Sequence, residues 1–105
     1  MVDDLRLKAI EAYEALYSDY ITEMRDDIEL HMIRVEGINE LNAETESHAM
    51  VERFRENLRA CKRDPSDSNI AELDGAVCYI NTKLRDMDRQ TLEPPLLFLN
   101  DYVDK

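Results

Sequence analysis

Residues that interrupt regular structure are scarce in this chain of 105 residues, which contains two glycines, three prolines and no tryptophan. Because glycine and proline most often mark turns, their scarcity favours a few long elements joined by short connections. The chain is rich in good helix formers, and it lacks the strict alternation of apolar and polar residues that is typical of strands. These features predict an all-α protein and exclude a sheet-based fold.

Long apolar runs are also missing. No stretch of about 18 uncharged apolar residues occurs, so no segment is expected to span a bilayer. The first six residues, Met-Val-Asp-Asp-Leu-Arg, lack the basic-then-apolar order of a secretion signal. We therefore expect a cytoplasmic protein that folds as a single helical domain over residues 1–105.

Cysteine is nearly as rare, and Cys61 and Cys78 cannot form a disulfide framework on their own. In a helical hairpin that turns near Pro65, the two residues would differ in level by about 9 Å of helix rise. That separation exceeds the ~7 Å between Cα atoms that a disulfide bridges. We expect both thiols to be reduced and to act as small buried apolar groups.

Positive charge is scarce relative to negative charge. The chain has 24 acidic and 13 basic residues, and its formal net charge of -11 disfavours direct binding to nucleic acid. The imbalance lies in the first half, because residues 1–52 hold fourteen acids and four bases whereas residues 53–105 hold ten acids and nine bases. An electrostatic function is therefore expected in the first half.

Apolar residues recur at intervals of three and four, which predicts long amphipathic helices. The expected helices are 3–36, 39–63 with Asn39 or Asn42 as N-cap, a third that opens with Asn69 and Glu72 as a capping box, and a short fourth from Pro95. Gly37 is the expected stop of the first helix. Short connections favour an antiparallel helical bundle of three main helices plus a short C-terminal helix.

Each helix carries a stripe that is a candidate for the core. The first has two stripes, Ile10, Tyr13, Tyr17, Tyr20, Met24, Ile28, His31 and Val35, and Leu5, Ala9, Ala12 and Leu16. The second has Ile38, Leu41, Thr45, His48, Val51, Phe54, Leu58 and Cys61. The third has Ile70, Leu73, Val77, Ile80, Leu84, Met87 and Thr91.

Two carboxylate–histidine pairs share one spacing. Asp27 and His31 are four residues apart, as are Glu44 and His48, and a hairpin about Gly37 would bring the four side chains to one level. Such a set could hold zinc or another divalent ion. A hydrogen-bonded polar layer that fixes the register of the helices is the interpretation we favour, so no metal or other cofactor is expected.

A magnesium-dependent nucleotide pyrophosphohydrolase is the enzymatic alternative. That class of small helical enzyme needs Glu-x-x-Glu and Glu-x-x-Asp pairs on adjacent helices. Glu11 and Glu14 supply the first spacing, but Gly75 occupies the position three residues after Glu72, and Asp74 lies one residue short. We therefore expect no catalytic residues in this chain.

Basic residues gather near the end of the second helix, at Arg53, Arg55, Arg59, Lys62 and Arg63. The hairpin geometry places this cluster beside Glu14, Asp19 and Glu23 of the first helix. We expect ion pairing within the chain, rather than a nucleic-acid patch, to account for most of the cluster.

The strongest concentration of acid lies in residues 23–46, with eight acids against Arg25 and Arg34. Together with apolar anchors, it favours a non-enzymatic protein-binding module: a small acidic inhibitor or adaptor that engages a basic protein, with imitation of nucleic acid as one mode. A purely structural homodimer is a further alternative, and excess apolar residues favour self-association. The candidate contacts are Glu36, Glu40, Glu44, Glu46, Phe98 and Tyr102 within or beyond this segment, and the row Tyr13, Tyr17 and Tyr20.

Overall fold

Four α-helices make up nearly all of the computed structural model, which describes the backbone of residues 2–103 and the side chains of residues 4–101. They are α1 (Val2–Arg34), α2 (Glu40–Arg63), α3 (Asp67–Asp86) and α4 (Pro95–Val103). The predicted all-α bundle of three long helices and one short C-terminal helix is confirmed.

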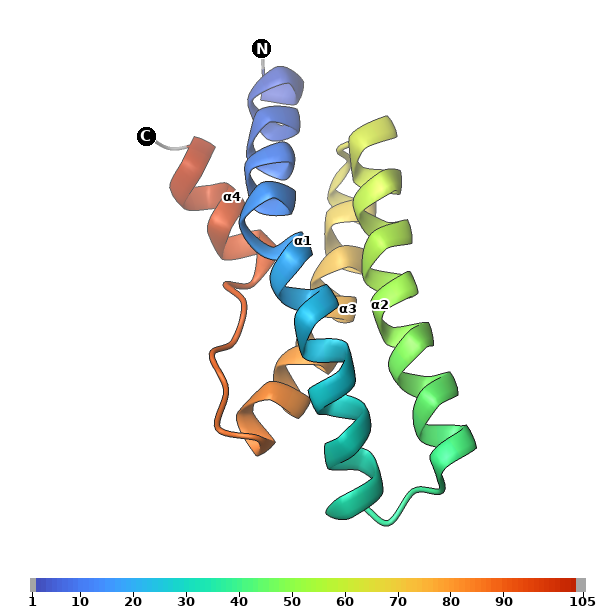
Figure 1. Cartoon of the computed structure of the whole chain (residues 1–105). Helices are drawn as coiled ribbons and strands as arrows, with labels where there is room; N and C mark the ends of the chain where they lie inside the picture. Colours follow the sequence, from blue (N-terminus) through green and yellow to red (C-terminus); the bar gives the residue numbers. More distant parts are fainter. Residues whose placement is uncertain (1, 104–105) are drawn as a thin grey trace.

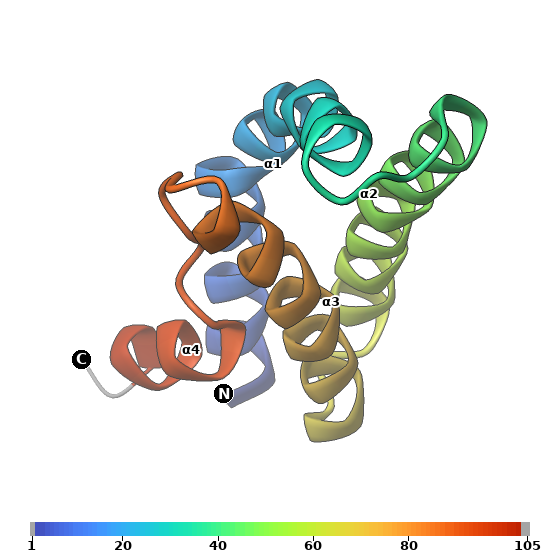
Figure 2. The same ribbon diagram turned by 90° about the horizontal axis from the view of Figure 1, so that it is seen from below.

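The helices pack as antiparallel neighbours around one core (Figures 1 and 2). α1 and α3 run in one direction and α2 and α4 in the other, so both ends of the chain lie at the same end of the bundle. α4 covers only part of the length of α1, and the extended linker of residues 87–94 covers the remainder. α1 changes direction about half-way along its length, where the Thr22 hydroxyl donates to the Ser18 carbonyl at 3.0 Å.

Local backbone conformation and capping explain where α1 ends and α2 begins. Gly37 takes a positive φ of 71°, a backbone conformation that glycine adopts without steric cost, and this ends α1. The Asn39 side chain then accepts a hydrogen bond from the Asn42 N–H at 2.9 Å and caps α2. Both features agree with the sequence prediction.

The start of α3 corrects the sequence prediction. Ser66, not Asn69, is the N-cap, because its hydroxyl accepts the Asn69 N–H at 3.2 Å. The Asn69 amide instead donates to the carbonyls of Ala60 and Asp64 at the end of α2. Asn69 therefore closes the turn between the helices rather than opening the second of them.

The end of α3 is also earlier than the stripe through Thr91 predicted. Asp88 adopts a left-handed φ of 59°, the Asp88 N–H donates to Arg85 at 3.0 Å, and the Arg89 N–H donates to Leu84 at 2.8 Å. These two bonds form a Schellman motif, which stops a helix. Met87 is the C-cap, and Thr91 lies in the linker.

The buried core confirms the stripes only in part. In the first half of α2, the expected Leu41, Thr45 and His48 are exposed, and Ala43, Ser47 and Met50 are buried in their place. In α1, Leu5, Leu16 and Val35 are exposed, and Ile21 and Met32 join the core. The bend in α1 changes which face meets α2, and a straight helical stripe does not anticipate that change.

The buried linker residue Leu92 has no helical partners, and a side chain of α3 supplies both of its backbone hydrogen bonds. Asn81 is 5% exposed; its amide donates to the Leu92 carbonyl and accepts from the Leu92 N–H, both at 2.8 Å. A buried backbone group without a partner would cost about 1–3 kcal/mol. Asn81 therefore allows a non-helical segment to enter the core.

Tyrosines of α1 hold the same linker from the other side. The Tyr13 hydroxyl donates to the Glu93 carbonyl at 2.7 Å, and the Tyr17 hydroxyl accepts from the Glu93 N–H at 3.1 Å. The Tyr20 hydroxyl donates to the Gln90 carbonyl. Burial, with smaller contributions from neighbouring Tyr17 and acidic groups, raises the pKa of Tyr13, which keeps its donating proton in place. The tyrosine row is thus internal structure and does not supply exposed anchors.

The cysteines occupy different environments. Both are free, as expected. Cys61 is fully buried, and its thiol donates to the Asn69 carbonyl at 3.3 Å. Burial raises the pKa of Cys61 to about 11. Cys78 is exposed, so the predicted buried role is confirmed for Cys61 and wrong for Cys78.

Replacing Asn81 by alanine should lower the free energy of unfolding by about 2–4 kcal/mol, because it strands two buried backbone groups of Leu92. Asn57→Ala is the matched control, since the Asn57 amide bonds only the Arg53 carbonyl of its own helix. It should change stability by about 0.5 kcal/mol or less. Urea denaturation followed by circular dichroism measures both, and equal losses would contradict this role of Asn81.

The two thiols should differ in reactivity. In the native protein, a disulfide reagent such as Ellman's reagent should modify Cys78 promptly and Cys61 only after denaturation, because the thiolate is the reactive form. The expected native stoichiometry is about one thiol per chain, falling to zero in Cys78→Ser. Two thiols reacting at one rate under native conditions would contradict the burial of Cys61.

Candidate functional site

The hairpin end, defined here as residues 23–46, combines exposed aliphatic side chains with carboxylates. Val35 is 71% exposed and Leu41 is 72% exposed, although both were expected in the core. Glu40, Glu44 and Glu46 are exposed on α2. Leu41 and Glu44 lie three residues apart on one helix and therefore share a face. Exposed apolar side chains and carboxylates therefore lie on one surface, and exposed apolar groups in such a setting are a sign of a binding site.

A hollow of about 380 Å³ opens beside Val35, between the last turns of α1 and the start of the linker. Its apolar lining consists of Leu30, Val35 and Met87. Asp27, His31, Arg34 and Arg89 supply the polar lining. The hollow is large enough to receive one or two side chains of another molecule.

Glu36 differs from the other predicted contacts because its carboxylate has an internal partner. The Lys83 ammonium of α3 donates to both of its oxygens, at 2.7 and 2.9 Å, and lies 5.7 Å from the centre of the Tyr79 ring. Burial by itself would lower the pKa of Lys83, but the hydrogen bond and charge of Glu36, with smaller contributions from Tyr79 and Glu46, raise it. Glu36 therefore joins α3 to the hairpin end.

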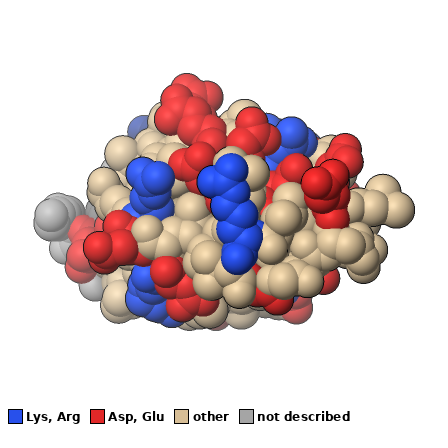
Figure 3. Space-filling model, turned by 60° about the horizontal axis from the view of Figure 1, so that its bottom comes forward, with Lys and Arg blue, Asp and Glu red and all other residues tan. Residues whose placement is uncertain are grey.

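The charge on this side of the molecule is consequently mixed. Arg89 lies 3.6 Å from Asp27, and Lys83 neutralises Glu36, so cations from the second half of the chain reach the acidic segment. Figure 3 shows acidic, basic and uncharged side chains interspersed over the surface near this end. The acidic surface is therefore narrower than the sequence suggested, and its unpaired acids lie chiefly on α2.

The four residues of the possible metal layer do not come together. Asp27 faces Arg89, and the His31 ring lies 3.8 Å from Glu36, whereas His48 lies on the exposed face of α2. Among the described residues, no group of three or more His, Cys, Asp or Glu side chains is placed to hold a metal ion. The expected layer is absent because Asp27 and His31 face α3 and its linker instead of α2.

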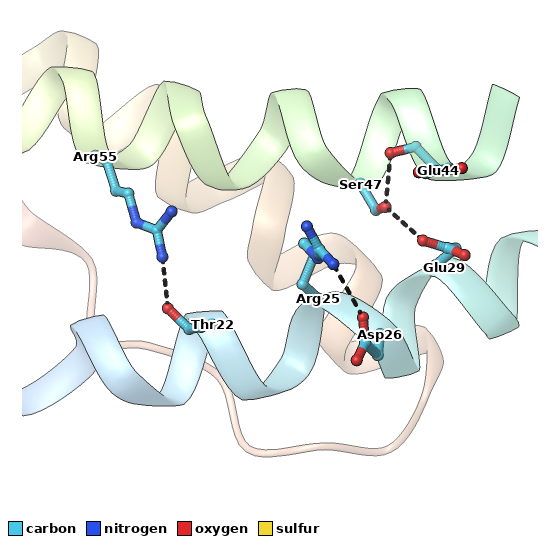
Figure 4. Close-up of polar contacts among 7 residues, drawn as sticks. All are labelled: Thr22, Arg25, Asp26, Glu29, Glu44, Ser47 and Arg55. Carbon is cyan, nitrogen blue, oxygen red and sulfur yellow. Dashed lines mark hydrogen bonds and ion pairs between the residues drawn. The ribbon is translucent and has the colours of Figure 1, made fainter. Parts of the chain in front are cut away.

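A smaller polar contact joins the two helices at this level. The hydroxyl of buried Ser47 donates to Glu29 at 3.4 Å and to the Glu44 carbonyl at 3.1 Å (Figure 4). Sequence reasoning missed Ser47, since a serine among apolar positions gives no distinctive pattern. Its small side chain lets α1 and α2 approach.

The basic cluster of α2 pairs with α1 at one of the three expected positions. Lys62 contacts both oxygens of Glu14 at 3.0 Å. Arg55 instead bonds Glu52 of its own helix at 3.0 Å and the Thr22 hydroxyl at 2.8 Å. Among the side chains that the structure describes, neither Asp19 nor Glu23 forms an ion pair.

The acids of the hydrolase pattern do not converge. Glu14 is committed to Lys62, and Glu11 and Glu72 are exposed on different helices. Asp74 is partly buried, and its Oδ1 atom is buried without a hydrogen-bond partner. This arrangement offers no shared magnesium site among the described residues.

The two partner contacts predicted in the C-terminal segment were Phe98 and Tyr102. The Phe98 ring packs edge-on against Tyr13 at 5.2 Å between centroids, so it holds α4 on α1. The exposed apolar residues of α4 are Leu96 and Leu97, at 45% and 57%. The side chain of Tyr102 lies outside those that the structure describes. Within the described helices, none is long and apolar enough to cross a membrane.

Replacing Glu36 by glutamine should lower stability at pH 7 by about 1–2 kcal/mol, because the Lys83 side chain, 12% exposed, would lose its carboxylate partner. Since pairing raises the pKa of Lys83, this stabilisation is present below the ordinary lysine pKa of 10.5 and is lost as the pH rises above it. Glu44→Gln is the matched control and should change stability by about 0.5 kcal/mol or less. Thermal denaturation at pH 7 measures both, and equal shifts in Tm would rule out the pairing.

Two surfaces therefore stand out: the hairpin end, and the α1–α2 groove into which Arg55 reaches toward Thr22. The first joins exposed aliphatic residues with carboxylates, and the lining of the second includes two arginines and one aspartate. Comparison with protein-family models, curated proteins and solved structures found no match to this chain.

Proposed function

We propose that this protein is a non-enzymatic, cytoplasmic protein-binding module that uses the hairpin end, residues 23–46, to engage its partner. The observation that carries the proposal is the coexistence of highly exposed Val35 and Leu41 with an adjacent hollow whose lining is partly apolar. Such side chains gain little by facing water, and their burial against a partner would contribute about 25 cal/mol for each Å² of apolar surface.

The energetics of binding follow from the two kinds of group present. Val35 and Leu41 act as anchors, and the hollow formed with Leu30 and Met87 receives an apolar side chain of the partner. Buried apolar anchors ringed by polar groups dominate the energetics of most protein interfaces. The hairpin end therefore supplies affinity through its apolar side chains.

The carboxylates on α2 set which partners are accepted. Glu40, Glu44 and Glu46 are exposed and have no ion pair among the described residues, so they are free to meet lysines or arginines. Complementary charge raises the association rate and rejects acidic partners. The partner is accordingly a basic protein, and this chain acts on it as an inhibitor or adaptor. In its most specific form, the proposal is that these carboxylates imitate the phosphates of a nucleic acid.

Glu36 is not a contact in this proposal, because its carboxylate is held by Lys83. Phe98 is likewise internal, since it packs against Tyr13. Leu96 and Leu97 replace Phe98 as the candidate contacts of α4, and they offer a second surface through which two copies of the chain could associate.

The proposal is tested by affinity capture from cells of the source organism, with the immobilised full chain as bait. The wild-type protein should retain a basic partner at about 50 mM salt and lose most of it at about 500 mM, because screening weakens exposed charge pairs. The triple variant Glu40→Gln, Glu44→Gln, Glu46→Gln should retain about tenfold less, and Leu41→Ser should reduce capture at both salt concentrations.

The control variant carries the same change of charge at exposed sites away from the hairpin end, Glu11→Gln, Glu56→Gln and Glu72→Gln. It should capture the partner as well as the wild type does. If both triple variants lose the partner equally, net charge alone is responsible and the assignment of the hairpin end fails. If Leu41→Ser has no effect, the apolar anchor is refuted.

A further inference from the structure

A second cavity lies in the groove between α1 and α2; its Arg25 and Asp26 fall within residues 23–46, but none of its lining residues is among the contacts named for the hairpin end. It encloses about 350 Å³. Its lining consists of Thr22, Arg25, Asp26, His48, Val51 and Arg55. Figure 4 shows the guanidinium groups of Arg25 and Arg55 both directed into the space between the helices, one from each side.

The charge of this lining is opposite to that of the molecule. Two arginines and one carboxylate, Asp26, line the cavity, so the lining has a formal charge of +1 in a protein of net charge -11; Glu52, outside the lining, pairs with Arg55 at 3.0 Å. The two guanidinium groups extend from different helices, and an anion bound between them would be attracted to both. The groove therefore gathers two guanidinium groups at which an anion can bind.

The two arginines differ in how firmly their side chains are held. Arg55 is held in position by the Thr22 hydroxyl at 2.8 Å and by Glu52 at 3.0 Å, so its orientation is fixed before a ligand arrives. Arg25 contacts Asp26 at only 3.4 Å, and its side chain is 41% exposed. A guanidinium has five N–H donors, and both groups therefore keep donors for a ligand.

The hydrogen-bond donors of Arg25 and Arg55 favour a phosphate over other anions. The planar fork of a guanidinium matches two oxygens of a phosphate, and two forks from opposite sides can bind different oxygens of one tetrahedral group. The His48 ring adds a polar contact, the Thr22 hydroxyl orients Arg55, and Val51 supplies an apolar wall for a small substituent. The volume of the cavity lies in the range of small-molecule sites and is too small for a long polymer.

We propose that the α1–α2 groove binds the phosphate group of a small phosphate monoester. Arg25 and Arg55 bind the phosphate oxygens from the two helices, Thr22 holds Arg55 in place, and His48 completes the contacts. Binding bridges α1 and α2 and so stabilises their packing. The site is independent of the hairpin-end contacts, so either proposal can fail without the other.

The test is a titration of the full chain, labelled with ¹⁵N, with inorganic phosphate and with phenyl phosphate at constant ionic strength, followed by NMR. Saturable shifts should be confined to the backbone and arginine side-chain signals of residues 22–26 and 48–55. Arg25→Gln and Arg55→Gln should each weaken binding about tenfold, the loss expected for one charge-assisted hydrogen bond. Acetate, a planar monoanion, should bind at least about tenfold more weakly than phosphate.

The matched control is Arg59→Gln, which removes one positive charge from an exposed position further along α2. It should change the affinity for phosphate by less than about twofold, since Arg59 does not line the cavity. Thermal denaturation of each variant checks that it folds. Shifts that do not saturate, equal losses in Arg25→Gln and Arg59→Gln, or acetate binding as tightly as phosphate would each overturn the proposal.

Discussion

The fold depends on one constraint: the linker of residues 87–94 leaves α3, crosses the bundle without helical hydrogen bonds, and buries Leu92. Buried backbone groups must find partners, and here they find them in side chains. Asn81 satisfies both groups of Leu92, and Tyr13 and Tyr17 satisfy both groups of Glu93. The position of α4, which closes the core over α1 and α3, follows from these bonds.

The same linker determines the electrostatics of the hairpin end. α3 ends at the Schellman motif around Asp88. This places Lys83 and Arg89 beside the acidic segment of α1 and the turn that follows it. The first half of the chain is acidic in sequence, yet part of its charge is compensated in space by the second half. Within the hairpin end, the acids without an ion pair lie chiefly on α2, beside exposed Leu41, and that combination supports the proposed binding function.

The number, type and approximate limits of the helices could be predicted from the sequence, because apolar spacing, Gly37 and Asn39 act locally. The contacts between helices could not. Tyr13, Tyr17 and Tyr20 formed an apolar row, but nothing in their spacing revealed that their hydroxyls bind a segment about 70–80 residues away.

The candidate sites show the same limit. The Glu36–Lys83 pair spans 47 residues, and the hairpin geometry used for the acidic segment did not include α3. The bend in α1 and the shifted buried face of α2 separated the expected Asp27, His31, Glu44 and His48 layer. The groove between Arg25 and Arg55 was likewise hidden, since their separation in sequence suggests no pair.

Hydrogen exchange at the linker amides tests the central claim most directly, because each amide reports its own hydrogen bond. If side chains satisfy the linker as described, the Leu92 and Glu93 amides should exchange as slowly as core amides of α3 such as that of Ile80. Exchange of Leu92 and Glu93 at the rate of an unprotected amide would contradict this account of how the linker and α4 are held.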